Sequence, residues 1–204
     1  MKYVDPDGRE VLNIQQQLLP VNIDGNRPGI SLYEARSVVM HWTGVPGQTA
    51  QQTRDYFGLS TTETSAHYVV GQEGEIIQMI PDNEKAYHAG GTGSLTDFAK
   101  KEYTTPNGTV APNLYTIGVE VNPEKKDGSY SKKAFNSSAK LAAKILNDNG
   151  LKTPFKGNLV RHGDITGKNC PKAFMNSKAK WEIFKLKVMI EQIKQKISLE
   201  NVNE

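Results

Sequence analysis

Two of the four histidines and the only cysteine of the chain stand at or just beyond the ends of predicted core strands, and their side chains could together hold a metal ion. His41 follows the apolar run 38–40, which is typical of a strand buried on both faces, and His162 follows the short apolar segment 159–161. Cys170 stands eight residues after His162. Two imidazoles and a thiolate suit zinc, and three protein ligands leave a fourth position for water. By residue type alone the ordinary alternative stays open, since isolated histidines mostly pack in cores or lie on surfaces.

Composition limits what else the chain can be. It has 204 residues, 37% of them hydrophobic, which is enough for the core of one domain. The 25 basic and 22 acidic residues are spread along the sequence and give a net charge of +3, so there is no basic patch of the kind that binds nucleic acid. The N-terminal segment lacks an apolar stretch behind a basic start, so we expect no signal peptide and no membrane insertion. We expect a monomer that is cytoplasmic when made.

Periodicity predicts the elements that must position the three metal-ligand candidates. From the order of these segments we expect an α/β fold class, a single domain with a mixed β-sheet of about five or six strands flanked by helices and the metal site at one edge of the sheet. The expected strands are 37–42, 66–70, 75–80, 115–121 and 159–161, with 66–70 and 75–80 forming a hairpin. The expected helices are a short one near 10–19, then 49–58, 95–103, 131–149 and 178–199.

The segments group into three parts. Residues 1–35 form an N-terminal arm, residues 36–176 the core that holds the candidate ligands, and residues 177–204 a C-terminal amphipathic helix. The helix has an apolar stripe made of Ile183, Leu186, Ile190, Ile193 and Ile197. Residues 82–114 are rich in Gly, Asn, Thr and Pro, and loops of such length usually carry function, so we expect substrate contacts there.

Five ordered segments then form a recognisable pattern: VVMHWTG, SAHYVVGQEGEIIQ, AYHAGG, IGVEV and RHGDITGKNCP. They resemble the zinc-dependent N-acetylmuramoyl-L-alanine amidase family, amidase type 2, which includes phage T7 lysozyme, anhydro-muropeptide amidases and peptidoglycan recognition proteins. The resemblance covers residues 38–171, roughly two thirds of the chain. It implies an enzyme that hydrolyses the amide bond between N-acetylmuramic acid and L-alanine in peptidoglycan or muropeptides, with one Zn²⁺ per chain bound by His41, His162 and Cys170.

The resemblance also implies two catalytic residues. Glu120 matches an acidic position of the muropeptide-type relatives and would act as general base, since Ala66 stands where other relatives have a tyrosine. Lys168 matches a lysine that faces the substrate carbonyl, where an ammonium stabilises the developing oxyanion. The alternatives are an ion-paired strand carboxylate and an ordinary surface lysine.

A further set of residues is expected to line the substrate groove. His88 aligns with a family histidine near that groove, and His67 is expected to be a hydrogen-bonded core residue. Aromatic and polar side chains near the ligands complete the expected substrate-binding set, which is His88, Trp42, Thr43, Tyr87 and Asn113.

One rival function and three settings remain open. The rival is a peptidoglycan-binding module of the same fold without hydrolysis, although relatives that only bind lack the cysteine that this chain has. The settings are a phage endolysin, a secretion-system effector acting on the wall after release, and a cytoplasmic enzyme of muropeptide recycling. The sequence does not choose among them.

Overall fold

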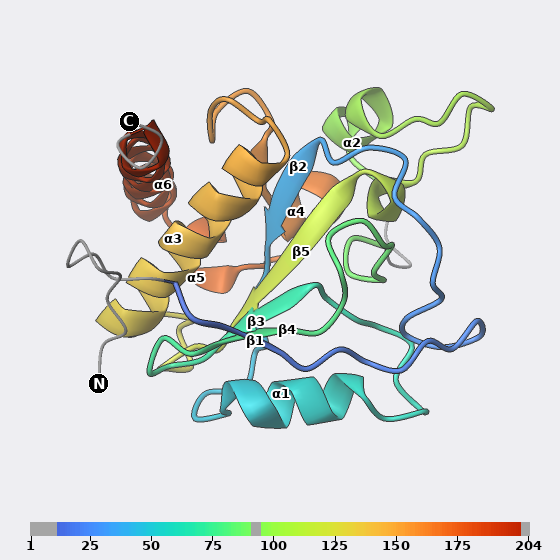
Figure 1. Cartoon of the computed structure of the whole chain (residues 1–204), viewed down its shortest axis with the longest axis horizontal. Coiled ribbons are helices and arrows are strands. Elements are labelled where there is room, and N and C mark those ends of the chain that lie inside the picture. Colours follow the sequence, from blue (N-terminus) through green and yellow to red (C-terminus); the bar gives the residue numbers. More distant parts are fainter. Residues whose placement is uncertain (1–11, 91–94, 201–204) are drawn as a thin grey trace.

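The architecture is a twisted six-stranded sheet with helices on both faces (Figure 1). The structure is a computed structural model, and it describes residues 12–90 and 95–200. The fold class expected from the sequence is confirmed, because the sheet is mixed and has six strands. The strands are β1 (Ile14–Gln16), β2 (Ser37–Met40), β3 (Tyr68–Val70), β4 (Ile76–Gln78), β5 (Thr116–Val121) and β6 (Leu159–Arg161).

The strand order is β1-β4-β3-β5-β2-β6. Only β3 and β4 pair antiparallel, as the expected hairpin, and the other neighbours are parallel. Helices and a 3-10 turn connect them: α1 (Ala50–Phe57), α2 (Asp97–Glu102), η1 (Pro112–Leu114), α3 (Lys132–Asp148), α4 (His162–Thr166), α5 (Lys172–Met175) and α6 (Lys178–Glu200). Helices α4 and α5 were not expected from the sequence.

Alternation along the strands assigns the two faces of the sheet. Val38 and Met40 of β2 point into a core shared with α3 and α6, whereas Val39 points to the opposite face, where it packs with residues of α2 and α4. Val69 of β3 packs on that opposite side with Phe57 of α1. Helices α1, α2 and α4 therefore cover one face, while α3, with α6 outside it, covers the other (Figure 1).

The helix boundaries follow the sequence signals. Thr49 caps α1 through a capping box with Gln52, and Ser131 caps α3 by accepting a hydrogen bond from the backbone N–H of Ala134. Gly150 follows α3 with a φ of 68°, a conformation that glycine adopts without strain. No helix in the described part of the chain is long and apolar enough to cross a bilayer.

The expected short helix near residues 10–19 is wrong. Within its described part, residues 14–16 form strand β1, which pairs parallel with β4, Gln15 lying opposite Ile77. Pairing with an open sheet edge satisfies the backbone of this segment, so tertiary contact overrides its helical propensity. Part of the expected N-terminal arm therefore belongs to the sheet.

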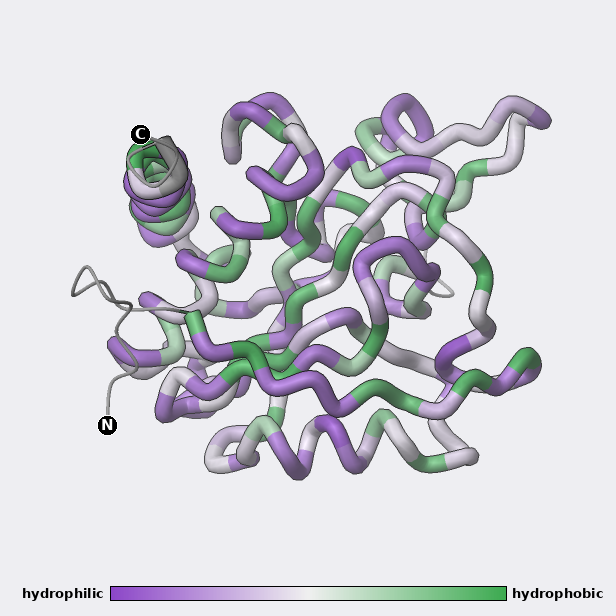
Figure 2. Tube along the Cα trace, in the orientation of Figure 1, coloured by the Kyte–Doolittle hydropathy of each residue, from purple (hydrophilic) through white to green (hydrophobic). Residues whose placement is uncertain are grey.

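Helix α6 forms as expected, but its apolar stripe does not face the core. Ile183 is 59% exposed, and the other four stripe residues are 45–52% exposed. The buried side instead carries Trp181, Phe184 and Val188, whose rings and methyl groups belong to the main core cluster. Figure 2 shows the resulting bands of hydrophobic and hydrophilic residues on this peripheral helix. Two apolar faces exist on one helix, and the aromatic one packs on the domain.

The burial of the aromatic side of α6 gives a stability prediction. Phe184→Ala should lower the free energy of unfolding by about 3–5 kcal/mol, because a fully buried ring would leave a cavity. Ile183→Ala is the matched control and should change it by less than about 0.5 kcal/mol, since that side chain is exposed. Urea unfolding of dilute protein measures both, and the reverse ranking would contradict this placement of the helix.

Candidate metal centre

The register of three parallel strands brings the main candidate residues side by side. Met40 at the end of β2 lies opposite Val119 of β5 and opposite Arg161 of β6. One residue further along the chain are His41, directly after β2, Glu120 within β5, and His162, directly after β6. Because side chains alternate along a strand, all three project to the face opposite α3. Residues far apart in the sequence thus meet at the carboxyl ends of the strands.

The third candidate ligand comes from the loop between α4 and α5. His162 begins α4, and the backbone N–H of Gly163 donates to the carbonyl of Cys170 at 2.8 Å, which returns the loop to the start of the helix. Asp164 holds this turn by accepting from the backbone N–H of Arg161 at 2.8 Å and from its guanidinium at 2.6 Å. Asp164 is therefore the capping residue of this turn.

The donor atoms of the three residues form one cluster. His41 Nδ1 is 3.1 Å from His162 Nδ1 and 3.9 Å from Cys170 Sγ, and all three donor atoms lie within 4.8 Å of one another. Tetrahedral zinc bonds would separate such donors by about 3.3–3.6 Å. The nitrogen and sulfur donors and their spacing fit a zinc ion, and His41 and His162 are 2% and 6% exposed, which keeps competing water away.

A chain of hydrogen bonds orients His41. The Nε2 of His88 lies 3.2 Å from the carbonyl oxygen of Thr116, which can only accept, so this nitrogen carries the proton. His88 Nδ1 must then accept, and it lies 3.0 Å from His41 Nε2, which is therefore the protonated nitrogen of His41. The unprotonated Nδ1 of His41 is left facing His162 and Cys170, as a metal ligand requires.

The ring of His88 fits only because residue 118 of β5 is a glycine. A Cβ on Gly118 would lie 2.5 Å from His88 Cγ, too close for any packing. Sequence reasoning missed this role, although a glycine inside the strand pattern IGVEV was a signal for close approach of another group. His67 is fully buried and bonded through both nitrogens, to Gly118 N–H and to the Glu84 carbonyl, which confirms its expected role in the core.

Burial sets the electrostatics of the centre. It lowers the pKa of His41 well below the usual value, and lowers that of His162 to about 4. It raises the pKa of the Glu120 carboxyl to about 8 and that of the Cys170 thiol to about 12. Each shift disfavours a charged side chain in a low-dielectric surrounding. Without a cation the four groups are thus mostly neutral at pH 7, and a bound cation would favour the thiolate and the carboxylate.

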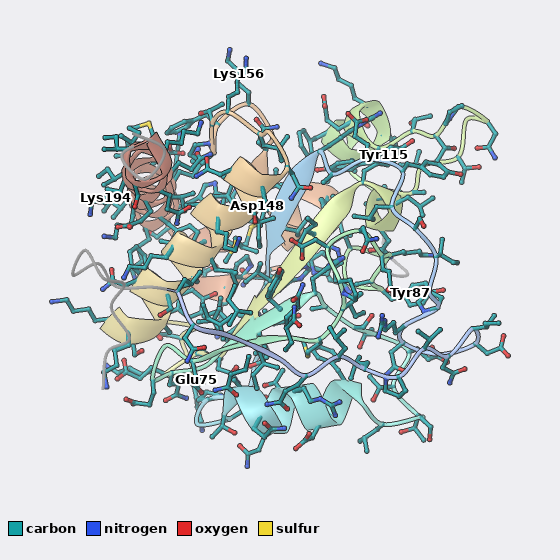
Figure 3. All side chains as sticks on the ribbon, viewed as in Figure 1. Glu75, Tyr87, Tyr115, Asp148, Lys156 and Lys194 are labelled. Atoms are coloured by element: carbon teal, nitrogen blue, oxygen red, sulfur yellow. The ribbon has the colours of Figure 1, made fainter. Side chains whose placement is uncertain are left out.

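These groups open onto a cleft of about 770 Å³. All ten residues singled out from the sequence line it, namely His41, His162, Cys170, Glu120, Lys168, His88, Trp42, Thr43, Tyr87 and Asn113. Their placement in one cavity is what the expected site requires. Tyr87, labelled in Figure 3, marks the side of the molecule on which the loop after β4 approaches the cleft.

The expected substrate-binding residues differ in whether their polar atoms already have hydrogen-bond partners in the protein. Thr43 Oγ1 is buried and, like Glu120 Oε2, has no hydrogen-bond partner among the described residues. A buried polar atom without a partner next to a cleft is available to a ligand. By contrast, Asn113 Oδ1 already accepts from the backbone N–H groups of His88 and Ala89. His88 is 7% exposed, and its ring bonds to the protein through both nitrogens.

Comparison with known proteins identifies the family. The model of the N-acetylmuramoyl-L-alanine amidase family matches residues 31–173. The chain belongs to this amidase family. The amidase BlyA of Bacillus subtilis is 36% identical over 175 residues, which cover 83% of this chain and 45% of BlyA. A probable amidase of Bacillus licheniformis is 33% identical over 168 residues, covering 80% of this chain and 44% of that protein.

The chain spans about half the length of these curated amidases. Solved structures match it over nearly their whole length. A mutant endolysin from Bacillus subtilis superposes with a TM-score of 0.66 at 29% identity, covering 87% of this chain and 99% of that chain. The catalytic domain of XlyA gives 0.66 at 28% identity, covering 86% and 99%. The amidase fold is thus the part that these proteins share.

The cleft has a second wall that sequence reasoning missed. It is formed by α1 and by the segments before and after it, through Val45, Gln48, Thr53, Tyr56, Phe57, Glu63, Thr64 and Ser65. Tyr130 was missed as well, although its hydroxyl lies 3.4 Å from the His41 carbonyl. Burial raises the pKa of Tyr130, and the nearby Cys170 and Glu120 raise it further. No motif in the sequence linked these segments to the ligands.

The pKa values predict how a zinc ion would bind at the candidate site. The imidazoles of His41 and His162 are already neutral at pH 7, because the pKa of each is lowered. Cys170 still holds its proton, because its pKa is raised to about 12. Zinc binding should therefore release at least about one proton, and affinity should rise about tenfold per pH unit. Calorimetry in buffers of different ionisation enthalpy measures the release; an affinity independent of pH would contradict it.

The hydrogen bonds of His88 give a second prediction. His88→Phe keeps a ring over Gly118 but removes the acceptor for His41 Nε2, so His41 is no longer held in the tautomer that binds metal. Zinc affinity should fall by about 10–100-fold. Tyr87→Phe, at the neighbouring position in the same cleft, is the control and should leave affinity unchanged. Competition with a chromophoric chelator measures both, and equal affinities would show that His88 does not orient the ligand.

Proposed function

We propose that this chain is a zinc-dependent N-acetylmuramoyl-L-alanine amidase that hydrolyses the amide bond joining N-acetylmuramic acid to the L-alanine of the peptidoglycan stem peptide. The observation that carries the proposal is the meeting, in one cleft, of a His-His-Cys donor cluster with a buried carboxylate and a lysine. The family of the chain supports the choice of substrate.

Zinc held by His41, His162 and Cys170 would supply a hydroxide nucleophile at neutral pH, by lowering the pKa of water to about 7. Glu120 is the general base in this proposal. Its Oε1 lies 4.0 Å from His41 Nδ1, and its buried Oε2 has no partner among the described residues. A carboxylate so placed takes a proton from the attacking water and returns it to the leaving amine of L-alanine.

Lys168 has the second catalytic role. It is exposed where it lines the cleft, and its ammonium is near enough to lower the pKa of both His41 and His162, after the larger effect of burial. The backbone N–H of Lys168 is 3.5 Å from Thr166 Oγ1 at the end of α4. A cation at the rim of the cleft stabilises the negative charge that develops on the carbonyl oxygen during attack.

The substrate is held by residues on both sides of the ligands. Trp42 and Tyr87 offer aromatic faces to sugar rings, and the unpartnered Thr43 Oγ1 offers a polar contact to the peptide. Asn113 and His88 have supporting roles, because their polar atoms already bond within the protein. Asn113 accepts from the backbone N–H of His88, and the His88 ring bonds to the candidate metal ligand His41. Because a mutant endolysin is among the similar structures, release onto the wall as an endolysin is the setting that we favour.

The rival function is binding of muropeptides without hydrolysis. Mass analysis of purified walls after incubation separates the two, since an amidase exposes the amine of L-alanine and a binding module leaves the walls intact. Exhaustive chelation should abolish hydrolysis, and added zinc should restore it. Full activity after chelation, or walls unchanged by the zinc-loaded protein, would overturn the proposal.

The general base gives a sharp mutational prediction. Glu120→Gln keeps the shape of the side chain but cannot accept a proton, so turnover should fall by about 10²–10⁴-fold. Zinc content should stay near one per chain, because Glu120 is not among the three donors. Lys168→Met should also lower turnover more than affinity, with partial rescue by Lys168→Arg. Turnover and zinc content are measured on the same samples, and unchanged turnover in Glu120→Gln would move the base elsewhere.

A further inference from the structure

The exposed stripe of α6 has the spacing of a coiled-coil seam. Ile183, Leu186, Ile190, Ile193 and Ile197 follow one another at intervals of 3, 4, 3 and 4 residues, which are the a and d positions of successive heptads. Each of the five is 45–59% exposed, although isoleucine and leucine are usually buried. An ordered row of this kind on a folded helix calls for a partner.

The helix cannot turn this stripe inward. Its opposite side is fixed by the buried rings of Trp181 and Phe184 and by amide contacts with α3. Gln192 Nε2 donates to Asn147 Oδ1 at 3.2 Å, and Gln195 Nε2 donates to the Lys140 carbonyl at 3.0 Å. In Figure 1 α6 lies outside α3 at the periphery of the fold. The seam therefore points away from the domain, with room for a second helix.

We propose that the seam pairs with the same seam of a second copy of the chain, as a parallel two-stranded coiled coil of α6 helices. A stripe limited to a and d positions is narrower than the apolar face of a helix that packs into a core or lies on lipid. Isoleucine fills all three a positions, and leucine fills the first d position, a pattern that favours two strands.

Charge complementarity selects the parallel orientation. In a parallel pair, Glu182 at a g position faces Lys187 at the e position of the other copy. Two attractive contacts then form by symmetry, in addition to the ion pairs that Glu182 makes with Lys185 and Lys187 makes with Glu191 in the same helix. In an antiparallel pair, e positions face each other, which brings Lys187 against Lys194 of the other copy. Lys194 projects from α6 at the outer edge of the molecule (Figure 3), and its side chain is 62% exposed. The parallel pair avoids this repulsion.

The seam is short, so the association should be moderate. Five aliphatic side chains per copy and the lysine stems beside them would bury on the order of 1,000 Å² over both copies, the lower limit of a specific interface. We expect a dissociation constant on the order of 10 µM. This dimer replaces the monomer expected from the sequence, and it does not depend on the function proposed for the cleft.

Sedimentation equilibrium of the full chain tests the dimer. Wild type should change from monomer to dimer with rising concentration, and Ile190→Lys should remain monomeric because it places two ammonium groups inside the seam. Ile23→Lys makes the same change at a site that is 81% exposed and remote from α6 in sequence, and it should dimerise like wild type. Glu182→Lys should weaken the dimer by about tenfold. A wild type that stays monomeric, or forms trimers, would overturn the proposal.

Cross-linking tests the orientation. Under oxidation, Ile183→Cys should give a covalent dimer, because the two introduced thiols face each other in a parallel pair. In an antiparallel pair residue 183 would lie beside residue 197, about 20 Å from its counterpart. Wild type, whose only cysteine is Cys170, and Ile23→Cys are the controls and should stay uncrosslinked. A dimer that forms without this cross-link would overturn the parallel arrangement.

Lipid is the competing occupant of the seam. Cosedimentation with vesicles containing phosphatidylglycerol decides between the two, because a helix rich in lysine can also lie on an anionic surface. A protein that is monomeric in solution and binds these vesicles through Ile190, losing that binding in Ile190→Lys, would overturn pairing with a second copy. Dimerisation without vesicle binding is the result that we expect.

Discussion

The parallel register of β5, β2 and β6 is the constraint on which the site depends. It places Glu120, His41 and His162 one step beyond the same row of paired residues, so the proposed general base and two candidate ligands share one height on the sheet. Strand alternation then sends all three to the face where α1, α2 and α4 leave a cleft. A shift of one strand by one residue would send its functional group into the core beneath α3.

Hydrogen bonds and burial complete what the register begins. The Thr116 carbonyl fixes His88, and His88 fixes the protonated nitrogen of His41, so a backbone acceptor determines which ligand atom faces the cluster. The same burial keeps Glu120 and Cys170 protonated, since the pKa of each is raised. A low-dielectric site with several neutral donors and a buried acid is stabilised by a cation, which pairs with the charges that burial disfavours. The geometry and the electrostatics of the site therefore both favour binding of a cation.

The fold was predictable where local pattern and tertiary role agree. The short apolar run before His41, the hairpin and the capped helix α3 all came from periodicity and turn residues, and the structure confirms them. The sequence pattern gave the wrong prediction where it was compatible with two different structures. Residues near 14–16 could extend a helix or an edge strand, and an open edge beside β4 decided for the strand. On α6 the aliphatic stripe gave the stronger period, but the aromatic side fits the groove beside α3.

The sequence pointed to residues that meet in one cleft, but not to the contacts among them. The sequence pointed to ten of the residues that line the cleft, yet nothing in the motif AYHAGG indicates that His88 would lie beside His41. That relation needs Gly118 on a third segment, because any side chain there would displace the ring of His88. It also needs Asn113, whose Oδ1 accepts a hydrogen bond from the backbone N–H of His88. The identity of the candidate ligands follows from residue type. Their orientation depends on contacts among segments that only the folded chain brings together, so the supporting residues could not be predicted from the sequence.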